Sequence, residues 1–402
     1  MEIMPMAETA DVVVVGAGVV GCSVAYYLSR QGADVKLVER EGIGSGASTH
    51  ATGFLSLLGA EFSQGPSFEF ALSAYREFPD LVKDLEESTG IDLLYQRRPS
   101  LRLALEEEEE TLIRDLMSWQ QESVSVKWIG PDDVHELEPR LTPQIRGAAY
   151  ENESAQLDSY RLTLALAQAA EKRGMELQLR PVTGLLRDNS RVTGVSTATG
   201  DIECGTVVMA AGTWSSSFGE SINFQIPVRP LKGERLILRF DGPPLPVLIS
   251  SPKRGHMISR LDGVLSVGST GGRDYDQNNL FLGEEFDSIP TETAKLELLQ
   301  RAIDVLPELE SAELIQQLAG SRPLSPDRMP IIGPIPSMDG IVLATGHSTK
   351  GIHLGPITGR IIAEYIQSGC TRMPQEMEAF LPSRFATASA IDFHASGRLV
   401  DE

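Results

Sequence analysis

The sequence predicts a protein of the α/β class, in which a parallel sheet is combined with a second, antiparallel sheet. Two observations predict this arrangement. First, short apolar runs rich in β-branched residues flank a helical pattern, as in Asp11–Val15, a helix over about 22–30, and Val35–Glu39; buried parallel strands have this composition. Second, apolar and polar residues alternate through 224–290, as antiparallel strands do.

The composition limits the size of the core and the kinds of partner. A chain of 402 residues that is 41% hydrophobic can bury a large core, and it suggests two domains or one domain with a second woven through it. The net charge of -21 repels nucleic-acid phosphates and anionic membranes. The 3 cysteines are scattered, and neither histidines nor carboxylates have metal-ligand spacing. We therefore expect no nucleic acid and no metal.

The N-terminal region contains no targeting or membrane-spanning pattern. The first ten residues lack a basic segment followed by an apolar one, so we expect no secretory signal. The one long apolar stretch, Val12–Leu28, is interrupted by glycines and lies between Asp11 and Arg30, whereas a bilayer span needs ~20 apolar residues. We therefore expect no membrane span and a cytoplasmic location.

Helical spacing and strand composition predict the other elements. Asp158 is a plausible N-cap, and Pro79 is expected to break or kink the helix that contains it. The predicted elements are helices over 66–88, 105–121, 158–173 and 356–367, strands with a hairpin over 175–212, a buried strand over 341–344, and a glycine-bearing loop over 346–355.

The pattern Gly16-x-Gly18-x-x-Gly21 lies between the first strand and the first helix, and Glu39 closes the next strand about 20 residues later. Gly16 permits a tight turn, Gly18 lets a pyrophosphate touch the backbone, and Gly21 lets the helix pack on the strand. The positive N-terminus of the helix attracts phosphates. Glu39 would accept hydrogen bonds from a ribose, and it disfavours NADP. The pattern predicts a Rossmann-type dinucleotide site; the alternative is a glycine-rich turn of an unrelated α/β protein.

Further small-residue segments accompany this fingerprint: Ser45–Gly53, Ala210–Trp214, Gly320–Gly333 and Ala344–His353. Together the segments resemble the D-amino-acid oxidase superfamily of FAD-dependent oxidoreductases, in the branch of glycine oxidase, sarcosine oxidase and dimethylglycine dehydrogenase. The resemblance extends over nearly the whole chain. It implies that FAD is the cofactor and that a glutathione-reductase-like FAD-binding domain is interleaved with a substrate domain built on an antiparallel sheet.

On this resemblance the domains are discontinuous. We expect the FAD-binding domain at 8–90, 145–225 and 320–375, the substrate domain at 91–144 and 226–319, and a polar C-terminal tail at 376–402.

In such relatives the loop at 346–351 and the helix from Pro356 lie under the flavin ring. Their backbone N–H groups and positive helix end would stabilise the negative charge of the reduced flavin. The residues expected to bind the cofactor are Gly16, Gly18, Gly21, Glu39, Arg40, Ser45, Gly46, Ala47, Ser48, Thr49, His50, Thr52, Gly53, Val182, Ala211, Gly212, Trp214, Arg322, Gly346, His347, Ser348, Thr349, Lys350, Gly351 and Ile352.

His50 lies in a segment that resembles the one in dimethylglycine and sarcosine dehydrogenases whose histidine is bonded to the flavin 8α-methyl. The resemblance implies that His50 is that covalent attachment point or a residue in contact with the flavin. The alternative is a histidine that only packs or caps here. Thr49 stands where those dehydrogenases often have tryptophan.

Four residues are candidates for catalysis on the same resemblance. Arg322 matches the arginine that glycine oxidase-like enzymes use to hold an amino-acid carboxylate; its alternative role is a structural salt bridge. His256 stands where relatives place a pocket tyrosine, and it could instead be a satisfied structural histidine. His353 stands where sarcosine oxidase has a lysine near the ring. Lys350 could donate toward the flavin or the substrate, or point to solvent.

These features favour an enzyme that oxidises the C–N bond of a small amino acid or N-methylated amino acid. Hydride would pass to flavin N5, and the resulting imine would hydrolyse. Two alternatives remain: oxidation of a 2-hydroxy acid, and a flavin-binding assembly protein without turnover.

The electron acceptor is O2 or another carrier. Some sarcosine oxidase relatives use a lysine of a substrate-domain strand to promote the reaction with oxygen. No lysine occurs here between Gly263 and Ala294, although Arg273 could substitute in part, so on this resemblance we favour a dehydrogenase. The chain could also form a homo-oligomer.

Overall fold

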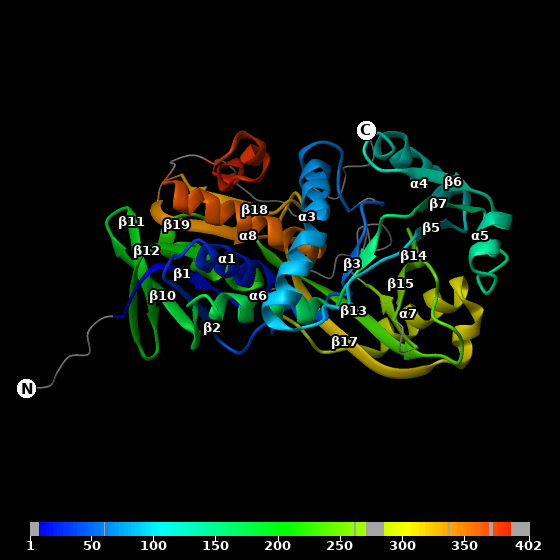
Figure 1. The fold of residues 1–402 in the computed structure, drawn as a ribbon, viewed down its shortest axis with the longest axis horizontal. Helices are drawn as coiled ribbons and strands as arrows, with labels where there is room; N and C mark the ends of the chain where they lie inside the picture. Colours follow the sequence, from blue (N-terminus) through cyan, green and yellow to red (C-terminus); the bar gives the residue numbers. More distant parts are fainter. Residues whose placement is uncertain are drawn as a thin grey trace, which may run out of the picture.

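Two large sheets lie side by side along the long axis of the molecule, and helices cover them (Figure 1). The computed structural model describes residues 8–59, 61–260, 263–270, 285–336, 338–369 and 373–386. Arg273, which the sequence offers as a partial substitute for a lysine, lies outside the described residues.

The first sheet contains the predicted parallel strands. Among the described strands its order is β10-β11-β19-β12-β1-β2-β9, with β18 paired to β19. Neighbours from β19 to β9 run parallel, whereas β10 and β11 form an antiparallel extension. The strands are β1 Glu8–Val15, β2 Val35–Glu39, β9 Glu176–Leu179, β10 Val182–Asp188, β11 Arg191–Thr197, β12 Gly200–Met209, β18 Ile331–Ile335 and β19 Met338–Thr345.

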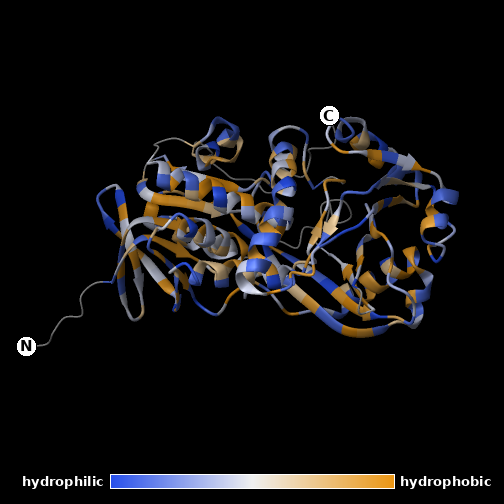
Figure 2. Ribbon diagram, viewed as in Figure 1, coloured by the Kyte–Doolittle hydropathy of each residue, from blue (hydrophilic) through white to orange (hydrophobic). Residues whose placement is uncertain are grey.

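The valines of β1 are buried on both faces of this sheet. Val12 and Val14 pack in the cluster that contains α1 (Val19–Arg30), α6 (Ser159–Glu171) and α8 (Gly351–Ser368). Val13 and Val15 pack on the other side, in a cluster with residues of β11 and β12. Figure 2 shows this apolar interior as orange strands beneath the helices. A strand buried on both faces has no polar alternation, which explains the continuous run of valines.

The second sheet has the order β17-β13-β16-β15-β14-β5-β7-β6. Its neighbours are antiparallel except for β14 and β5, which run parallel. The α/β class and the two kinds of sheet predicted from the sequence are confirmed. The strands are β5 Ser100–Ala104, β6 Val126–Ile129, β7 Gly147–Glu151, β13 Arg229–Arg239, β14 Leu248–Ser251, β15 Gly255–Ser259, β16 Val264–Gly268 and β17 Glu313–Leu324.

A small three-stranded sheet and several short helices complete the described structure. The strands are β3 Phe54–Leu55, β4 Gln96–Arg97 and β8 Ala155–Gln156, and the remaining α-helices are α2 Ala47–His50, α3 Pro66–Thr89, α4 Glu107–Gln120, α5 Pro131–Leu137 and α7 Glu292–Val305. The 3-10 helices are η1 Gly212–Phe218, η2 Glu220–Ile222, η3 Pro307–Ser311, η4 Ser348–Lys350, η5 Gln375–Phe380 and η6 Pro382–Phe385. No helix of the described residues has both the length and the apolarity that a membrane crossing requires.

Asp158 caps α6, as predicted, because its side chain accepts a hydrogen bond from the Arg161 backbone N–H. Pro79 does not break α3, which continues through it because buried residues on both sides, Phe78 and Leu81 among them, hold the helix in the core. The predicted start of the last long helix is wrong. The last long helix begins at Gly351, before Pro356, because the preceding loop already turns helically in η4.

Two observations bear on the proposed domain boundaries, which stay a proposal. β7 pairs with β5 and β6 in the second sheet, so the proposed start of an FAD-binding segment at 145 falls before a strand of the other sheet. The first part of the expected tail packs against α3, since the centre of the Phe380 ring lies 4.9 Å from that of the Phe70 ring. Residues 387–402 lie outside the described part of the chain.

His353 fastens α8 to α3. Its Nε2 atom lies 2.9 Å from the Ala71 carbonyl oxygen and donates its hydrogen to it. The ring lies among the rings of Phe62, Tyr75 and Phe78. Burial lowers the pKa of His353 to about 4, so the imidazole is neutral near pH 7. His353 thus has a structural role, and because it also lines the cavity described below, its expected catalytic role stays a proposal.

The free energy of unfolding is expected to depend on pH through His353. Its folded-state pKa lies below the value of 6.5 for an ordinary histidine, so the unfolded chain binds the proton first as the pH falls. Lowering the pH from 7 to 5 should therefore remove about 2 kcal/mol of stability through this group. The variant His353→Gln, which keeps an N–H donor, should lack this part of the pH dependence in urea titrations. Parallel pH profiles of the two proteins would contradict the assignment.

Candidate active site

A cavity of about 470 Å³ lies between the two sheets. The residues that follow the carboxyl ends of β1, β2, β12 and β19 line one part of it, and side chains and glycines of the second sheet line another part. Ligands of open α/β sheets bind outside the carboxyl ends of the strands. The cavity is therefore the candidate site.

The glycine fingerprint forms the tight approach that the sequence predicts. Gly16 has φ +102, and a Cβ there would lie 2.6 Å from the Ala210 carbonyl oxygen. A Cβ at Gly21 would lie 1.9 Å from the Gly16 oxygen, so this glycine lets α1 pack on the strand and does not line the cavity. Gly18 does line the cavity, next to the N-terminal residues Val19 and Val20 of α1. This end of the cavity fits a phosphate group.

Glu39 and Arg40 form the wall at the end of β2. One Glu39 oxygen, Oε2, accepts a hydrogen bond from the Ala17 N–H at 2.8 Å, and Oε1 accepts one from the Glu41 N–H at 2.9 Å. Because a carboxylate has about four acceptor positions, capacity remains for ribose hydroxyls. The Arg40 guanidinium lies 3.8 Å from the centre of the Trp214 ring. Glu39, Arg40 and Trp214 all line this part of the cavity.

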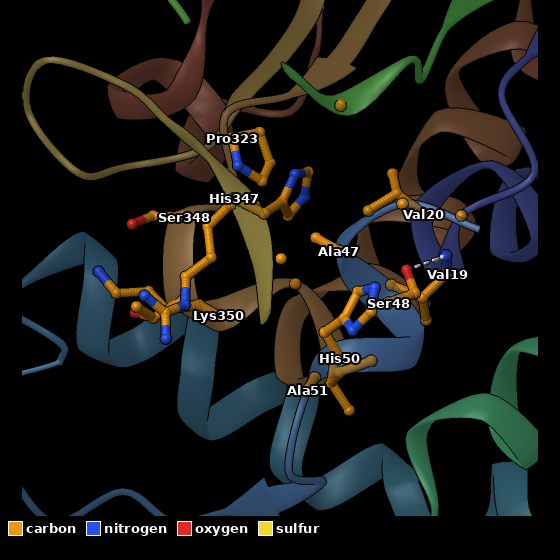
Figure 3. A pocket seen from close by; sticks show the side chains of 18 of the residues that line it. Val19, Val20, Ala47, Ser48, His50, Ala51, Pro323, His347, Ser348 and Lys350 are labelled. Carbon is orange, nitrogen blue, oxygen red and sulfur yellow. Dashed lines mark hydrogen bonds between the residues drawn. The ribbon is translucent and has the colours of Figure 1, made fainter. Parts of the chain in front are cut away.

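The segment from Ser45 to Thr52 folds as a turn and the short helix α2. Ser48 Oγ accepts a hydrogen bond from the Val19 N–H at 2.9 Å, which joins α2 to the start of α1 (Figure 3). Figure 3 also shows His50 on one side of the cavity and His347 on the other. His347 Nε2 lies 3.0 Å from Thr358 Oγ1, and burial lowers the pKa of His347 to about 3. Two segments almost 300 residues apart in the chain thus face one another.

Most residues expected to bind the cofactor line this one cavity. Four do not: Gly21, Thr49, Gly53 and Gly346. Thr49 donates its hydroxyl to the Gly44 carbonyl, and Gly53 and Gly346 have φ +77 and φ +71; they shape the turns that present their neighbours. Those that line it are Gly16, Gly18, Glu39, Arg40, Ser45, Gly46, Ala47, Ser48, His50, Thr52, Val182, Ala211, Gly212, Trp214, Arg322, His347, Ser348, Thr349, Lys350, Gly351 and Ile352.

On the second sheet, Arg322 extends over a position that has no side chain. A Cβ at Gly233 would lie 2.2–2.3 Å from Nη2, Cζ and Nη1 of Arg322, so the guanidinium covers this glycine. Arg322 Nη2 donates to Ser269 Oγ at 2.8 Å and to the Thr270 carbonyl at 3.2 Å. These bonds hold the guanidinium in the wall of the cavity. The sequence predicts the residue but not the glycine platform beneath it.

His256 also lines the cavity, on β15. Burial, with Arg322 and Arg235 nearby, lowers its pKa to about 4, so the ring is neutral near pH 7. Its Nε2 atom is buried and has no hydrogen-bond partner among the described residues.

Lys350 does not point to solvent: Nζ donates to the Arg328 carbonyl at 3.1 Å and lies 5.2 Å from the Phe62 ring centre.

Arg235 lines the cavity from β13 and was not among the residues predicted from the sequence. Desolvation lowers its pKa to about 10. The sequence holds one feature that could have indicated it: Gly233 and Arg235 occupy alternate positions of one strand and therefore face the same side of the sheet. Arg102, Ser250 and Glu61 also line the cavity and also escaped prediction. Their segments meet only in the folded chain.

The cavity fits the FAD that the sequence resemblance implies. Bare glycine backbone lies at the start of α1, the Glu39 carboxylate lies at the end of β2, and two lining polar atoms, His50 Nδ1 and Thr213 Oγ1, are buried without a partner among the described residues. A bound molecule with acceptor and donor atoms along its length would satisfy them. Within the same residues, no group of three or more His, Cys, Asp or Glu side chains could hold a metal ion.

Comparisons with known proteins show the family of the chain. The family model described as FAD dependent oxidoreductase matches residues 11–365. The glycine oxidase of Pseudomonas aeruginosa is 32% identical over 88% of this chain and 93% of its own length. The crystal structure of glycine oxidase from Geobacillus kaustophilus has a TM-score of 0.87 at 29% identity, covering 94% of this chain and 99% of that one. The glycine oxidase structure from Bacillus cereus has a TM-score of 0.82 at 31% identity, with 90% and 96% covered. The chain therefore belongs to the FAD-dependent oxidoreductase family of D-amino-acid oxidase type, as a glycine oxidase-like flavoenzyme.

Proposed function

We propose that this enzyme oxidises the C–N bond of a small amino acid or N-methylated amino acid. The observation that carries the proposal is the Arg322 guanidinium, which lies over Gly233 in the same cavity as the cofactor segments. A guanidinium binds a carboxylate through two parallel hydrogen bonds. A carboxylate held there would keep the substrate's α-carbon in one orientation within the cavity.

Bound FAD would supply the redox chemistry, by accepting a hydride from the carbon next to nitrogen. The protein residues bind and orient the substrate. Neutral His256 offers one donor and one acceptor nitrogen, and its unpartnered Nε2 can accept a hydrogen bond from the substrate amine. The amine would react in its neutral form, and the imine product would hydrolyse in water.

An anaerobic titration tests the reaction class. Glycine, sarcosine, D-amino acids and 2-hydroxyglutarate would each be added to the holoenzyme, and loss of the yellow absorption of oxidised flavin would be followed. We expect bleaching by amino or N-methylamino acids. Bleaching by the hydroxy acid alone would instead establish the C–O oxidation that the sequence leaves as an alternative.

Substitution of Arg322 tests the carboxylate site. Arg322→Met should lower kcat/KM for the amino-acid substrate by about 10- to 100-fold, because hydrogen bonds to charged groups contribute about 1.5–3 kcal/mol. Arg239→Met is the matched control, since Arg239 is an exposed arginine of β13 that lies 3.4 Å from Glu313. Steady-state kinetics of the two variants measure the difference. A loss of equal size in both would contradict the assignment.

We further propose that His50 contacts the flavin, either as its covalent attachment point or as a non-covalent neighbour. Three features support contact: His50 lines the cavity, its Nδ1 is buried without a partner among the described residues, and burial followed by the effect of Arg235 lowers its pKa. A neutral imidazole is the nucleophilic form that covalent attachment requires.

The variant His50→Ala should retain less flavin per protein than the native enzyme after gel filtration, because a contact with the cofactor is lost. Acid precipitation of the native protein then separates the two versions. Yellow colour that stays in the pellet indicates covalent attachment, whereas colour found wholly in the supernatant excludes it. Undiminished flavin content in the variant would contradict contact of either kind.

We propose that the physiological electron acceptor is a carrier other than O2. The support is that no lysine occurs between Gly263 and Ala294, whereas some sarcosine oxidase relatives use a lysine of a substrate-domain strand to promote the reaction with oxygen. In stopped-flow mixing of reduced enzyme with aerated buffer, oxidised flavin should return slowly compared with turnover on an artificial acceptor dye. Reoxidation by air at least as fast as turnover with the dye would make the enzyme an oxidase.

A further inference from the structure

A row of cross-strand neighbours on the second sheet forms part of the cavity wall. The register pairs Ser250 with His256, His256 with Gly268, and Gly268 with Arg235. Directly paired residues project from the same face of a sheet, and Ser250, His256 and Arg235 all line the cavity. Gly268 lets the last two side chains lie close together across the sheet. A Cβ there would lie 3.0 Å from Arg235 Cβ and 3.5 Å from His256 Nε2.

The Arg235 guanidinium makes few hydrogen bonds for a charged group in the wall of a cavity. Nη1 donates to Ser266 Oγ at 3.0 Å, and Nη2 lies 3.5 Å from the Thr49 carbonyl oxygen. Its Nε atom is buried and has no hydrogen-bond partner among the described residues. A charge withdrawn from water costs free energy unless it is paired and hydrogen-bonded. An anionic group bound in the cavity beside Arg235 would offset this cost.

The nearby protein carboxylate does not fill this role. The charge of Asp158 acts on Arg235, but no ion pair joins them in the described part of the chain. Asp158 accepts a hydrogen bond from the Arg161 N–H as the cap of α6, and its Oδ2 atom lies 3.5 Å from Arg260. The Asp158 carboxylate therefore has other partners, and Arg235 keeps an excess of positive charge.

Arg235 and Arg322 together place two positive charges near one neutral ring. Arg322 covers Gly233, which precedes Arg235 by two residues on the same face of β13, about 7 Å along the strand. Both arginines act on His256 and, with its burial, favour the neutral form of that ring, whereas Glu61 acts in the opposite direction. A substrate with one carboxylate would compensate only one of the two guanidinium charges.

We propose that Arg235 is a second carboxylate site, and that the preferred substrates are amines that carry two carboxylates. Arg322 binds one carboxylate, Arg235 binds the other, and the amine faces His256. The chemical class includes aspartate, glutamate and iminodiacetate. This inference rests on the proposed oxidation of a C–N bond, and it adds the substrate class.

The wild-type holoenzyme tests the substrate class first. kcat/KM should be higher for at least one of aspartate, glutamate (each as both enantiomers) and iminodiacetate than for glycine and sarcosine, by about tenfold or more. Oxidation of none of these compounds would contradict the proposed function itself. Oxidation of glycine or sarcosine in preference to every dicarboxylate would leave that function standing and overturn only this inference.

The variant Arg235→Met then tests the residue. The ratio of kcat/KM for the best dicarboxylate to that for glycine should fall by about 10- to 100-fold, as expected for loss of one charge-assisted pair, and Arg235→Lys should restore part of it. Arg239→Met, which removes the same charge from the same strand, should leave the ratio at its native value. An unchanged ratio in Arg235→Met, or an equal loss for both substrates, would overturn the inference.

A binding measurement on the native protein covers the case in which the Arg235 variants fail to fold. Succinate, which has two carboxylates and no oxidisable amine, should perturb the absorption of the bound flavin at a concentration at least about tenfold below that needed for acetate, because it can pair with both guanidinium groups. Equal dissociation constants for succinate and acetate would contradict a second carboxylate site.

Discussion

Close backbone approach, made possible by missing side chains, is the constraint on which this structure depends. At Gly16 and Gly21 it lets α1 approach β1 closely enough for the first turn of the helix to line the cavity. At Gly233, Gly268 and Gly320 the second sheet leaves space that the side chains of Arg322, Arg235 and His50 occupy. The same physical device thus builds both walls, because only glycine lets other atoms lie where a Cβ would be.

Electrostatics then divides the cavity into regions of different character. The carboxylate of Glu39 lies at the end that fits a ribose, whereas the arginines of the second sheet face the other end. The histidines between them are neutral because burial disfavours their charged forms. They can therefore exchange hydrogen bonds without adding charge. This separation would allow one cavity to hold a dinucleotide and the proposed anionic substrate together.

Much of the fold could be predicted because its signals are local. The valine run of β1, the glycine spacing through Gly21 and the cap at Asp158 each fall within a few residues, and each matches the structure. The site was predicted only in part. Arg322 and His256 came from a resemblance to known enzymes, whereas Arg235 carried no motif. Its position in the wall follows from strand register, which pairs it with Gly268 and which local sequence does not reveal.

The sequence by itself determined the class of the fold, because helix and strand periodicity is local. Its glycine fingerprint indicated a dinucleotide site, and the resemblance of several small-residue segments indicated the family. Only the tertiary structure decided which side chains share the cavity and what each of them bonds. His353 and Lys350 both line it and are three residues apart in the chain, yet one bonds to the Ala71 carbonyl of α3 and the other to the Arg328 carbonyl. The reason is physical: a buried polar atom must find its partner in space, and that partner comes from a distant segment.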